Sequence, residues 1–425
     1  MNLADTRQPR ATPPKKRALK RQLLLNEAAR QMNERGAGAI SLAEIAEVAG
    51  LSRNAMYYYC TDRADLAFQC YLRSCEAATE CMALALEEGD NAVSRIQAYV
   101  RRMLDFDQPE FAALYDPDFL PEPQRSTIFE LNRRNVEGLQ TLIEDGIRER
   151  LLRSVHTEIA AQMLLGMINW TLLTNNWLGQ KDSRPRRRNI TKVIIDLFLN
   201  GASARPEVAF ECKLDATSLM ARPFNAFDRV QATQEKMAQL IDAAARLFNR
   251  RGLDGVSLDE ISASVGATKG AVYHYFNDKM DLITRCYDRA FELYALFLDV
   301  AKGQAGSGFE RAMAVLHLNS QAQRCQSAPL VLQPGLFSLS EVHRLRFVER
   351  ARDIWDRSTA MVSEGIEDGT YRRCDAASVA HVSAGAFLWL HKWLPDDYPM
   401  SPIEIADTQC GIFAEGVSCK RQISA

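Results

Sequence analysis

The stretch SLDEISASVGATKGAVYHYFNDKMDL, residues 257–282, has a near copy earlier in the same chain. Residues 41–66 read SLAEIAEVAGLSRNAMYYYCTDRADL, at a constant offset of 216 positions and without a gap. When residues 24–71 are aligned with residues 240–287, 20 of the 48 positions are identical. An ungapped match of this length indicates a duplication, so we expect two related units in the chain.

The bulk composition is that of an ordinary globular protein with two or three domains. The chain has 425 residues, of which 47% are hydrophobic and 25% charged, and its net charge is only −2. It has no long apolar run and no apolar segment after its basic N-terminus, so neither a membrane span nor a secretory signal is expected. The 10 cysteines lack the spacing of a metal site, which favours reduced thiols in a cytoplasm.

Helical periodicity and capping residues predict how each copy begins. The apolar positions of residues 23–35 and 237–251 fall on one face of a helix. A second helix follows in each copy and opens with a Ser-x-x-Glu capping box, at residues 41–44 and 257–260. Each copy therefore starts with two consecutive short helices.

A glycine turn separates the second helix of each copy from a short third helix. Gly50 and Gly266 supply the turn, and Ser52 and Thr268 cap the third helix. Helix, tight turn and helix form the helix-turn-helix arrangement, in which the last helix enters the major groove of DNA. Each copy is therefore predicted to be a DNA-binding domain.

The outer face of each third helix carries the candidate DNA contacts. Ala55 and Tyr59, and likewise Ala271 and Tyr275, are expected to pack inward. The caps and the opposite face then present two sets of side chains: Ser52, Arg53, Asn54, Tyr57 and Tyr58 in the first copy, and Thr268, Lys269, Gly270, Tyr273 and His274 in the second. Arginine and asparagine suit base edges, whereas tyrosine hydroxyls suit phosphates.

A cation stands at the first turn of the following helix in both copies, at Arg63 and Lys279. A positive charge at that position opposes the helix dipole. A phosphate bound at the helix N-terminus would account for it, so both cations join the candidate DNA contacts.

A basic segment, residues 1–22, precedes the first copy. It is either a solubilising tail or an arm along the DNA backbone, and its place next to a predicted DNA-binding domain favours the arm. Prolines disfavour a helix in its first part. Its cations, opposed by Asp5 alone, are Arg7, Arg10, Lys15, Lys16, Arg17, Lys20 and Arg21.

Each copy resembles the N-terminal DNA-binding domain of the TetR family of bacterial transcriptional regulators. The resemblance rests on the capped second helix, the aromatic run and the closing K-x-D-L, which the second copy matches closely as ATKGAVYHYFNDKMDL. The first copy departs from this pattern at Cys60, where phenylalanine is usual, and at Arg63, where lysine is usual. Cys60 offers less packing beneath the third helix, so the first copy is expected to be the less stable DNA-binding unit.

The resemblance implies an all-α chain of two tandem units, each with a helical core that binds a ligand and dimerises, and with no cofactor. Faint landmarks indicate that the cores were duplicated too, since Gly166 and Trp170 match Gly385 and Trp389 at an offset of 219. The expected division is an arm at 1–22, DNA-binding domains at 23–71 and 235–287, cores at 72–201 and 288–418, and a linker at 202–234.

Two helices, at residues 160–178 and 378–394, are apolar nearly all round, as expected for elements buried on two sides. The resemblance implies that they form a four-helix dimer bundle with the last helix of each half, at about 188–200 and 402–415. A plain buried core helix would show the same pattern. The cores could pair within the chain as a pseudo-dimer, or between chains as a homodimer or larger assembly. Tethering favours the pair within the chain.

The resemblance implies a transcriptional regulator in the bacterial cytoplasm, associated with the nucleoid. In this hypothesis a small hydrophobic or aromatic effector releases a repressor from its double-stranded DNA operator. No catalytic or nucleotide-binding motif occurs, so neither an enzyme nor a metal site is expected, and the residues that bind the effector stay unknown. Two alternatives remain: a ligand-independent architectural protein, and an interaction adaptor in which one copy has lost DNA reading.

Overall fold

The computed structural model describes residues 14–105, 109–174, 184–205, 210–222, 229–336 and 339–419. The first half comprises α1 (Pro14–Arg35), η1 (Ala37–Ala39), α2 (Leu42–Val48), α3 (Arg53–Met56), α4 (Arg63–Glu88), α5 (Ala92–Met103), η2 (Pro117–Phe119), α6 (Gln124–Arg148), α7 (Thr157–Thr174) and α8 (Arg184–Asn200). After α9 (Ala216–Met220), the second half comprises α10 (Arg229–Arg251), α11 (Leu258–Ser264), α12 (Lys269–Tyr275), α13 (Lys279–Lys302), α14 (Gly308–Gln323), α15 (Glu341–Glu367), α16 (Ala376–Leu388), α17 (Leu390–Trp393) and α18 (Pro402–Glu415).

The prediction of an all-α chain is confirmed, because the described residues contain helices and no strand. Within the same residues, no helix is long and apolar enough to cross a membrane. We call α1–α3 the first head and α10–α12 the second head, and we call α4–α8 and α13–α18 the first and second cores.

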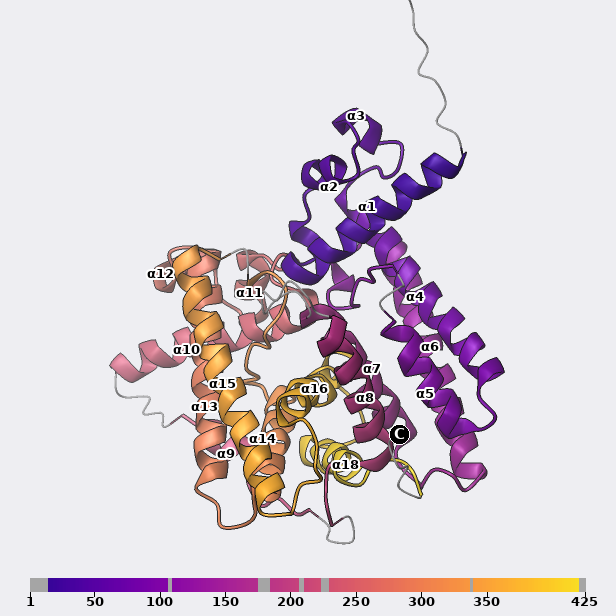
Figure 1. The fold of residues 1–425 in the computed structure, drawn as a ribbon. Helices are drawn as coiled ribbons and strands as arrows, with labels where there is room; N and C mark the ends of the chain where they lie inside the picture. Colours follow the sequence, from indigo (N-terminus) through magenta and orange to yellow (C-terminus); the bar gives the residue numbers. More distant parts are fainter. Residues whose placement is uncertain are drawn as a thin grey trace, which may run out of the picture.

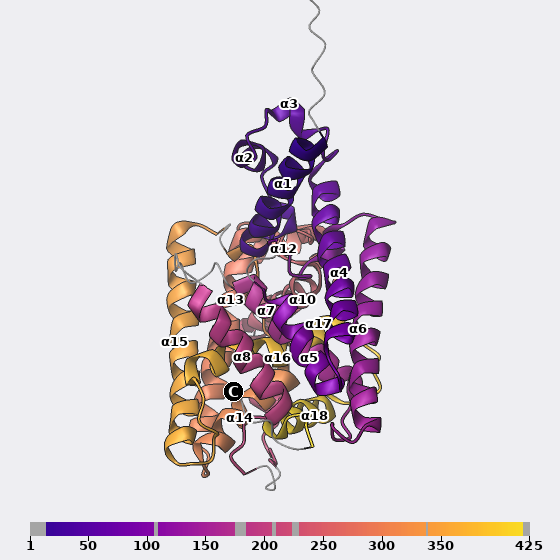
Figure 2. The same cartoon turned by 45° about the vertical axis from the view of Figure 1, so that its right-hand side comes forward.

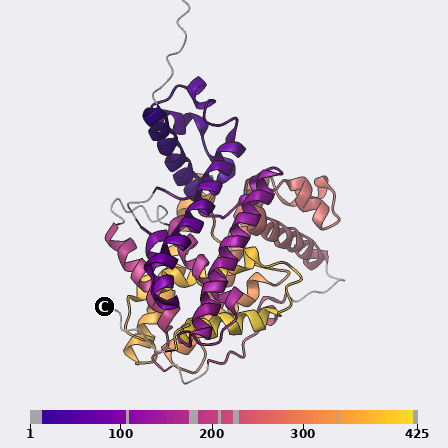
Figure 3. The ribbon, with the colours of Figure 1, turned by 90° about the vertical axis from the view of Figure 1, so that its right-hand side faces the viewer.

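The two cores pack against each other through α7 and α8 of the first core and α16 and α18 of the second. Figures 1 and 2 show α4–α6 on one side of these four helices and α13–α15 on the other. Both heads lie towards the end of the molecule away from α18, and the first head projects further (Figures 1 and 3).

Helices α7 and α16 cross at a pair of glycines. A Cβ atom on Gly166 would meet the Gly385 carbonyl and would lie 2.8 Å from the Trp389 Cβ. A Cβ atom on Gly385 would in turn lie 2.6 Å from the Trp170 Cβ. Only glycine allows this approach, so α7 is a pairing helix rather than a plain core helix. Its side chains are buried almost all round, as the apolar pattern of its sequence predicts.

Reciprocal backbone hydrogen bonds tie the ends of the two cores together. The Ala202 N–H donates to the Phe413 carbonyl at 2.8 Å, and the Val417 N–H donates to the Phe198 carbonyl at 2.9 Å. These donors and acceptors occupy equivalent positions in the two copies. A second pair of bonds repeats the exchange one residue further along. The ends of the two cores thus bind each other through equivalent residues.

Each head is fastened to its own core by an asparagine, which is buried in the first head and partly buried in the second. The Asn33 side chain donates to the Phe111 carbonyl and accepts from the Ala113 N–H, both at 2.8 Å. Asn249 makes the same two bonds with residues 329–331, each at 2.9 Å. The amide side chain satisfies one carbonyl and one N–H of a loop in the core, so each head is held to that loop.

Two helices begin earlier than the sequence pattern predicts. Helix α1 starts at Pro14, inside the predicted arm 1–22, because proline is tolerated in the first turn of a helix. The cations of residues 15–21 are therefore helical, while those at positions 7 and 10 lie outside the described residues. Helix α10 starts at Arg229, inside the predicted linker 202–234, and α9 also lies in that segment.

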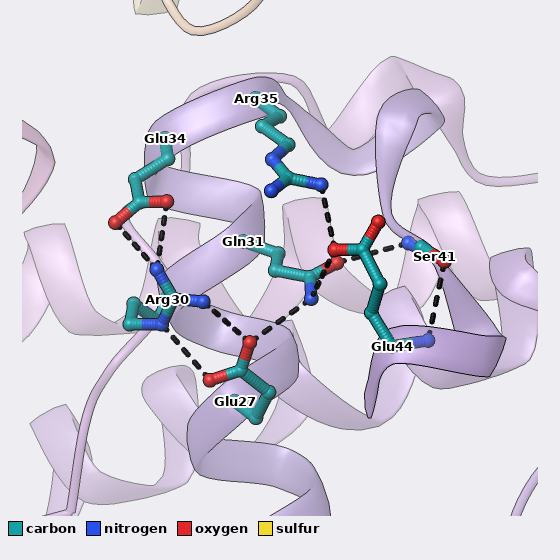
Figure 4. A network of polar contacts seen from close by, with 7 residues as sticks. All are labelled: Glu27, Arg30, Gln31, Glu34, Arg35, Ser41 and Glu44. Atoms are coloured by element: carbon teal, nitrogen blue, oxygen red, sulfur yellow. Dashed lines mark hydrogen bonds and ion pairs between the residues drawn. The ribbon is translucent and has the colours of Figure 1, made fainter. Parts of the chain in front are cut away.

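The predicted capping box of the first copy closes only halfway. Ser41 Oγ accepts from the Glu44 N–H at 3.3 Å, as expected. The Glu44 carboxylate accepts from Arg35 at 2.9 Å, and the Ser41 N–H donates instead to Gln31 Oε1 (Figure 4). The box at residues 257–260 closes fully. Gln31 thus accepts the hydrogen bond that the Glu44 side chain would accept in a complete capping box. Helix-capping patterns in the sequence do not predict this exchange.

Candidate nucleic-acid interface

The third helix of each head is capped by the residue predicted for that role. Ser52 Oγ accepts from the Ala55 N–H at 3.2 Å, and Thr268 Oγ1 accepts from the Ala271 N–H at 3.3 Å. These bonds fix where α3 and α12 begin. Each helix follows its neighbour after a tight turn, so both heads have the helix-turn-helix order.

The side chains beneath the third helices are one position further along than predicted. Met56 and Cys60 are buried in the first head, and Val272 and Phe276 in the second. The residues expected there, such as Ala55 and its counterparts, are only half-buried. The predicted buried positions differ from the observed ones by one residue, because such short helices contain too few positions for periodicity to define a buried face.

The third helix is shorter in the first head than in the second. Helix α3 ends at Met56, whereas α12 continues to Tyr275. Tyr57 and Tyr58 therefore lie in the turn after α3 rather than on a helix. The small Cys60 side chain occupies the place that Phe276 fills under α12, which gives the first head less packing there.

The predicted third-helix contacts lie on the surface in both heads. Tyr57, Tyr58 and Tyr273 are 56%, 74% and 50% exposed. The remaining members of the two sets are also exposed: Ser52, Arg53 and Asn54, and Thr268, Lys269, Gly270 and His274. The exposure of these side chains leaves both faces accessible to a partner.

Arg53 and Lys269, the first cations on the two exposed faces, differ in their contacts within the protein. Arg53 has no hydrogen bond or ion pair with any described residue. The Lys269 ammonium pairs with the Asp259 carboxylate of α11 at 3.0 Å, and this contact raises the pKa of Lys269. The position equivalent to Asp259 in the first head is Ala43, so Arg53 has no such carboxylate beside it.

Arg63 and Lys279 open α4 and α13, but each already has neighbours inside its head. The Arg63 guanidinium donates to the Gly38 carbonyl at 3.1 Å. The Lys279 ammonium lies 5.9 Å from the centre of the Phe248 ring, and burial lowers its pKa. The aspartate before each cation caps the helix through its carboxylate. These caps balance the helix N-terminus, so no phosphate is needed to explain the two cations.

A buried carboxylate of the first core touches both heads. Asp116 accepts a hydrogen bond from the Ala37 N–H at 2.9 Å and another from the Tyr71 hydroxyl. A Cβ atom on Gly252, in the second head, would lie 3.0 Å from the Asp116 Cβ. Burial raises the pKa of Asp116. No sequence signal pointed to Asp116, because it lies outside the repeated segment.

An apolar cavity of about 120 Å³ lies inside the second core. It is lined by residues of α13, α14, α15 and α16. Its lining includes Tyr294, Leu298, Val315, Met361 and Phe387. The cavity is smaller than most ligand sites, so it suits a compact apolar group.

Two family models match this chain, and each matches it twice. The model for bacterial regulatory proteins of the tetR family matches residues 24–70 and 240–286. The model for the tetracyclin repressor-like C-terminal domain matches residues 90–202 and 311–417. The four matched segments cover most of the chain and place one head and one core in each half.

Similar proteins match single halves or single heads. The HTH-type transcriptional regulator AcrR of Shigella flexneri is 40% identical over 58 residues, which is 14% of this chain and 27% of that protein. The HTH-type transcriptional repressor KstR2 of Mycolicibacterium smegmatis is 24% identical over 190 residues, 42% of this chain and 89% of that protein. The chain thus spans only about a quarter of the length of AcrR but most of KstR2.

Solved structures of single regulators align with about half of the chain. A TetR-family regulator from Bordetella parapertussis covers 45% of this chain and 100% of its own, with 19% identity and a TM-score of 0.37. The regulator PfmR from Thermus thermophilus covers 42% and 97%, with 24% identity and a TM-score of 0.36. With two matches to both family models and a head and a core in each half, the chain belongs to the TetR family of bacterial regulatory proteins as a tandem duplication.

Proposed function

We propose that this chain is a transcriptional regulator that binds one double-stranded DNA operator with both heads. The observation that carries the proposal is the repeated exposed face, Arg53–Tyr58 and Lys269–His274, on two helix-turn-helix units of one chain. The family to which the chain belongs consists of bacterial regulatory proteins, which supports the same function. It would act on nucleoid DNA in a bacterial cytoplasm.

We assign different roles to the exposed side chains. Arg53 and Asn54 in the first head, and Lys269 and His274 in the second, have the donors and acceptors that read base edges in the major groove. Gly270 lets the backbone of α12 approach the DNA closely. Ser52, Thr268 and the exposed tyrosines hold phosphates, and Arg63 and Lys279 add positive charge behind them.

We further propose that the chain works as a single-chain pseudo-dimer. The crossing of α7 with α16 and the reciprocal bonds between the core ends support pairing within the chain. The heads then differ at the base-reading positions, so the operator should have two unlike half-sites instead of a palindrome.

A small hydrophobic or aromatic effector would release the operator by binding in the second core. Its cavity lies beside α14, which leads into the loop held by Asn249. A ligand that displaces α14 would therefore displace the second head. The name of the relative KstR2, a transcriptional repressor, supports repression as the outcome.

Selection of DNA fragments by the full chain tests the proposed function. The expected result is a recurring site with two different half-sites about one helical turn apart, roughly 34–36 Å between their centres. Selection of no recurring sequence would support the architectural alternative. A site with a single half-site would mean that one copy has lost DNA reading.

Replacing Asp259 with alanine should strengthen DNA binding through the second head. Lys269 must leave Asp259 before it can reach a base, and exposed ion pairs are weak, so the gain in affinity should be about fivefold at most. The measurement is the affinity of the full chain for its selected operator at fixed salt.

The matched variant for this prediction is Ala43→Asp. It places a carboxylate at the equivalent position of the first head, next to Arg53, and should weaken binding. If Asp259→Ala weakened binding instead, Asp259 would be positioning Lys269 for DNA rather than holding it back.

A further inference from the structure

A second, larger cavity lies between the second head, the second core and the first copy. It has a volume of about 490 Å³ and shares only Leu388 with the lining of the apolar core cavity. Helix α10 forms one wall, and the ends of α14 and α16 form others. Tyr115 and Trp170 add to the lining from the first copy.

The lining combines aromatic rings with an excess of positive charge. Tyr115, Trp170 and Trp389 contribute rings. Four cationic side chains face a single carboxylate among the lining residues, namely Arg246, Arg250, Arg324 and Lys392 against Asp396. An apolar wall beside several cations matches a ligand that has an apolar body and a negative end.

Three of the four cations are already bonded within the protein. Arg250 pairs with Asp396, and Arg324 donates to the Pro395 carbonyl at 2.9 Å. Lys392 donates to the backbone carbonyls at the end of α10, and burial lowers its pKa to about 8. Arg246 alone has no hydrogen bond or ion pair with any described residue, although it is partly buried.

The equivalent arginine of the first copy is paired with two glutamates. Arg30 occupies the position equivalent to Arg246, and its guanidinium pairs with Glu27 at 2.5 Å and with Glu34 at 2.7 Å (Figure 4). In the second copy, the positions of these two glutamates are taken by Ala243 and Arg250. The second copy therefore has neither carboxylate beside Arg246 and has an additional cation there.

We propose that this cavity binds a small organic anion, with its carboxylate or phosphate on Arg246 and its aromatic or aliphatic body against Trp170 and Trp389. A guanidinium that is half-buried among other cations is unfavourable until an anion pairs with it. The charge-assisted hydrogen bonds of such a pair are among the strongest available to a ligand. The first copy cannot offer the same anchor, because Glu27 and Glu34 already neutralise Arg30.

The position of the site gives the ligand a means of affecting DNA binding. An occupant would touch α10 of the second head, the second core and the first copy at once. It would therefore hold the second head in one orientation relative to the first. This consequence rests on the proposed function, whereas binding of the anion does not.

Titration calorimetry of the full chain with three naphthalene compounds tests the proposal. We expect 1-naphthyl phosphate or 1-naphthoate to bind at one site per chain, and neutral 1-naphthol to bind far more weakly. The tighter of the two anions identifies the charged group that the site accepts. Absence of binding by both anions at millimolar concentration overturns the proposal, and so does equal binding of the neutral compound.

Variants at the two equivalent arginines locate the binding site. Arg246→Gln should lower the affinity for the anion roughly 10- to 150-fold, whereas Arg246→Lys should retain part of it. Arg30→Gln is the matched control and should leave the affinity unchanged. Wild-type affinity in Arg246→Gln, or an equal loss in Arg30→Gln, contradicts the assignment. DNA binding is measured separately on the same variants, so that a failure of the site is distinguishable from a failure of the DNA-binding proposal.

Discussion

Gly166→Ala is expected to loosen the pairing of the two cores and to lower the stability of the chain by about 3 kcal/mol, the upper end for an overpacked core. The new Cβ atom would overlap the Gly385 carbonyl and lie 2.8 Å from the Trp389 Cβ. Neither neighbour is the end of a flexible side chain, so relief requires α7 and α16 to separate. Denaturant or thermal unfolding of the full chain measures the loss.

Gly138→Ala is the matched control for this prediction. Gly138 also lies inside a helix, but a Cβ atom there would meet nothing within 4 Å. Alanine should therefore stabilise α6 by up to about 1 kcal/mol through its better helix propensity. If Gly166→Ala were as stable as Gly138→Ala, α7 and α16 would not be in contact in solution.

Arg53→Ala is expected to abolish base preference at one position of one half-site, at a cost of about 1–3 kcal/mol of discrimination. Arg53 makes no bond within the described protein, so its removal should leave the folding stability unchanged. Affinities for operators with single base changes in each half-site measure the effect.

A phosphate-contacting residue should behave differently. Tyr57→Phe removes one exposed hydroxyl and should weaken binding to all sequences alike, because phosphates carry no sequence information. Lys269→Ala should affect only the other half-site. If Arg53→Ala left base selectivity intact, the outward face of α3 would not be the base-reading face.

The sequence predicted the two heads because their helices begin at local signals. The caps Ser52 and Thr268 act on N–H groups three residues away, so their roles could be inferred without any tertiary contact. The landmarks Gly166 and Gly385 stood out for a related reason. Two helices that cross this closely need glycine at the contact, and the duplication kept it in both copies.

Features that depend on partners far along the chain were missed. The incomplete capping box arises from Gln31, which reaches Ser41 across the first head. The junction at Asp116 could not be inferred, since the residue has no counterpart in the repeat and its bonds join segments 79 and 45 positions apart. These contacts are tertiary, and helical periodicity carries no information about them.

The unpaired Arg246 is an intermediate case. The absence of glutamate partners for Arg246 is visible when the copies are aligned, because Ala243 and Arg250 stand at the positions of Glu27 and Glu34. That Arg246 faces a cavity between three parts of the molecule became clear only from the structure. Divergence between duplicated copies is thus most informative at positions that form ion pairs in one copy only.

The mass of the complex between the chain and its selected operator tests the single-chain pseudo-dimer most directly. Sedimentation should give one 47.8 kDa chain per operator, and the free protein should sediment as a monomer. Footprinting of the same complex should show two unlike half-sites, each protected by one head. Two chains on a palindromic operator, or a stable dimer of the free chain paired through α7, α8, α16 and α18, would contradict the account.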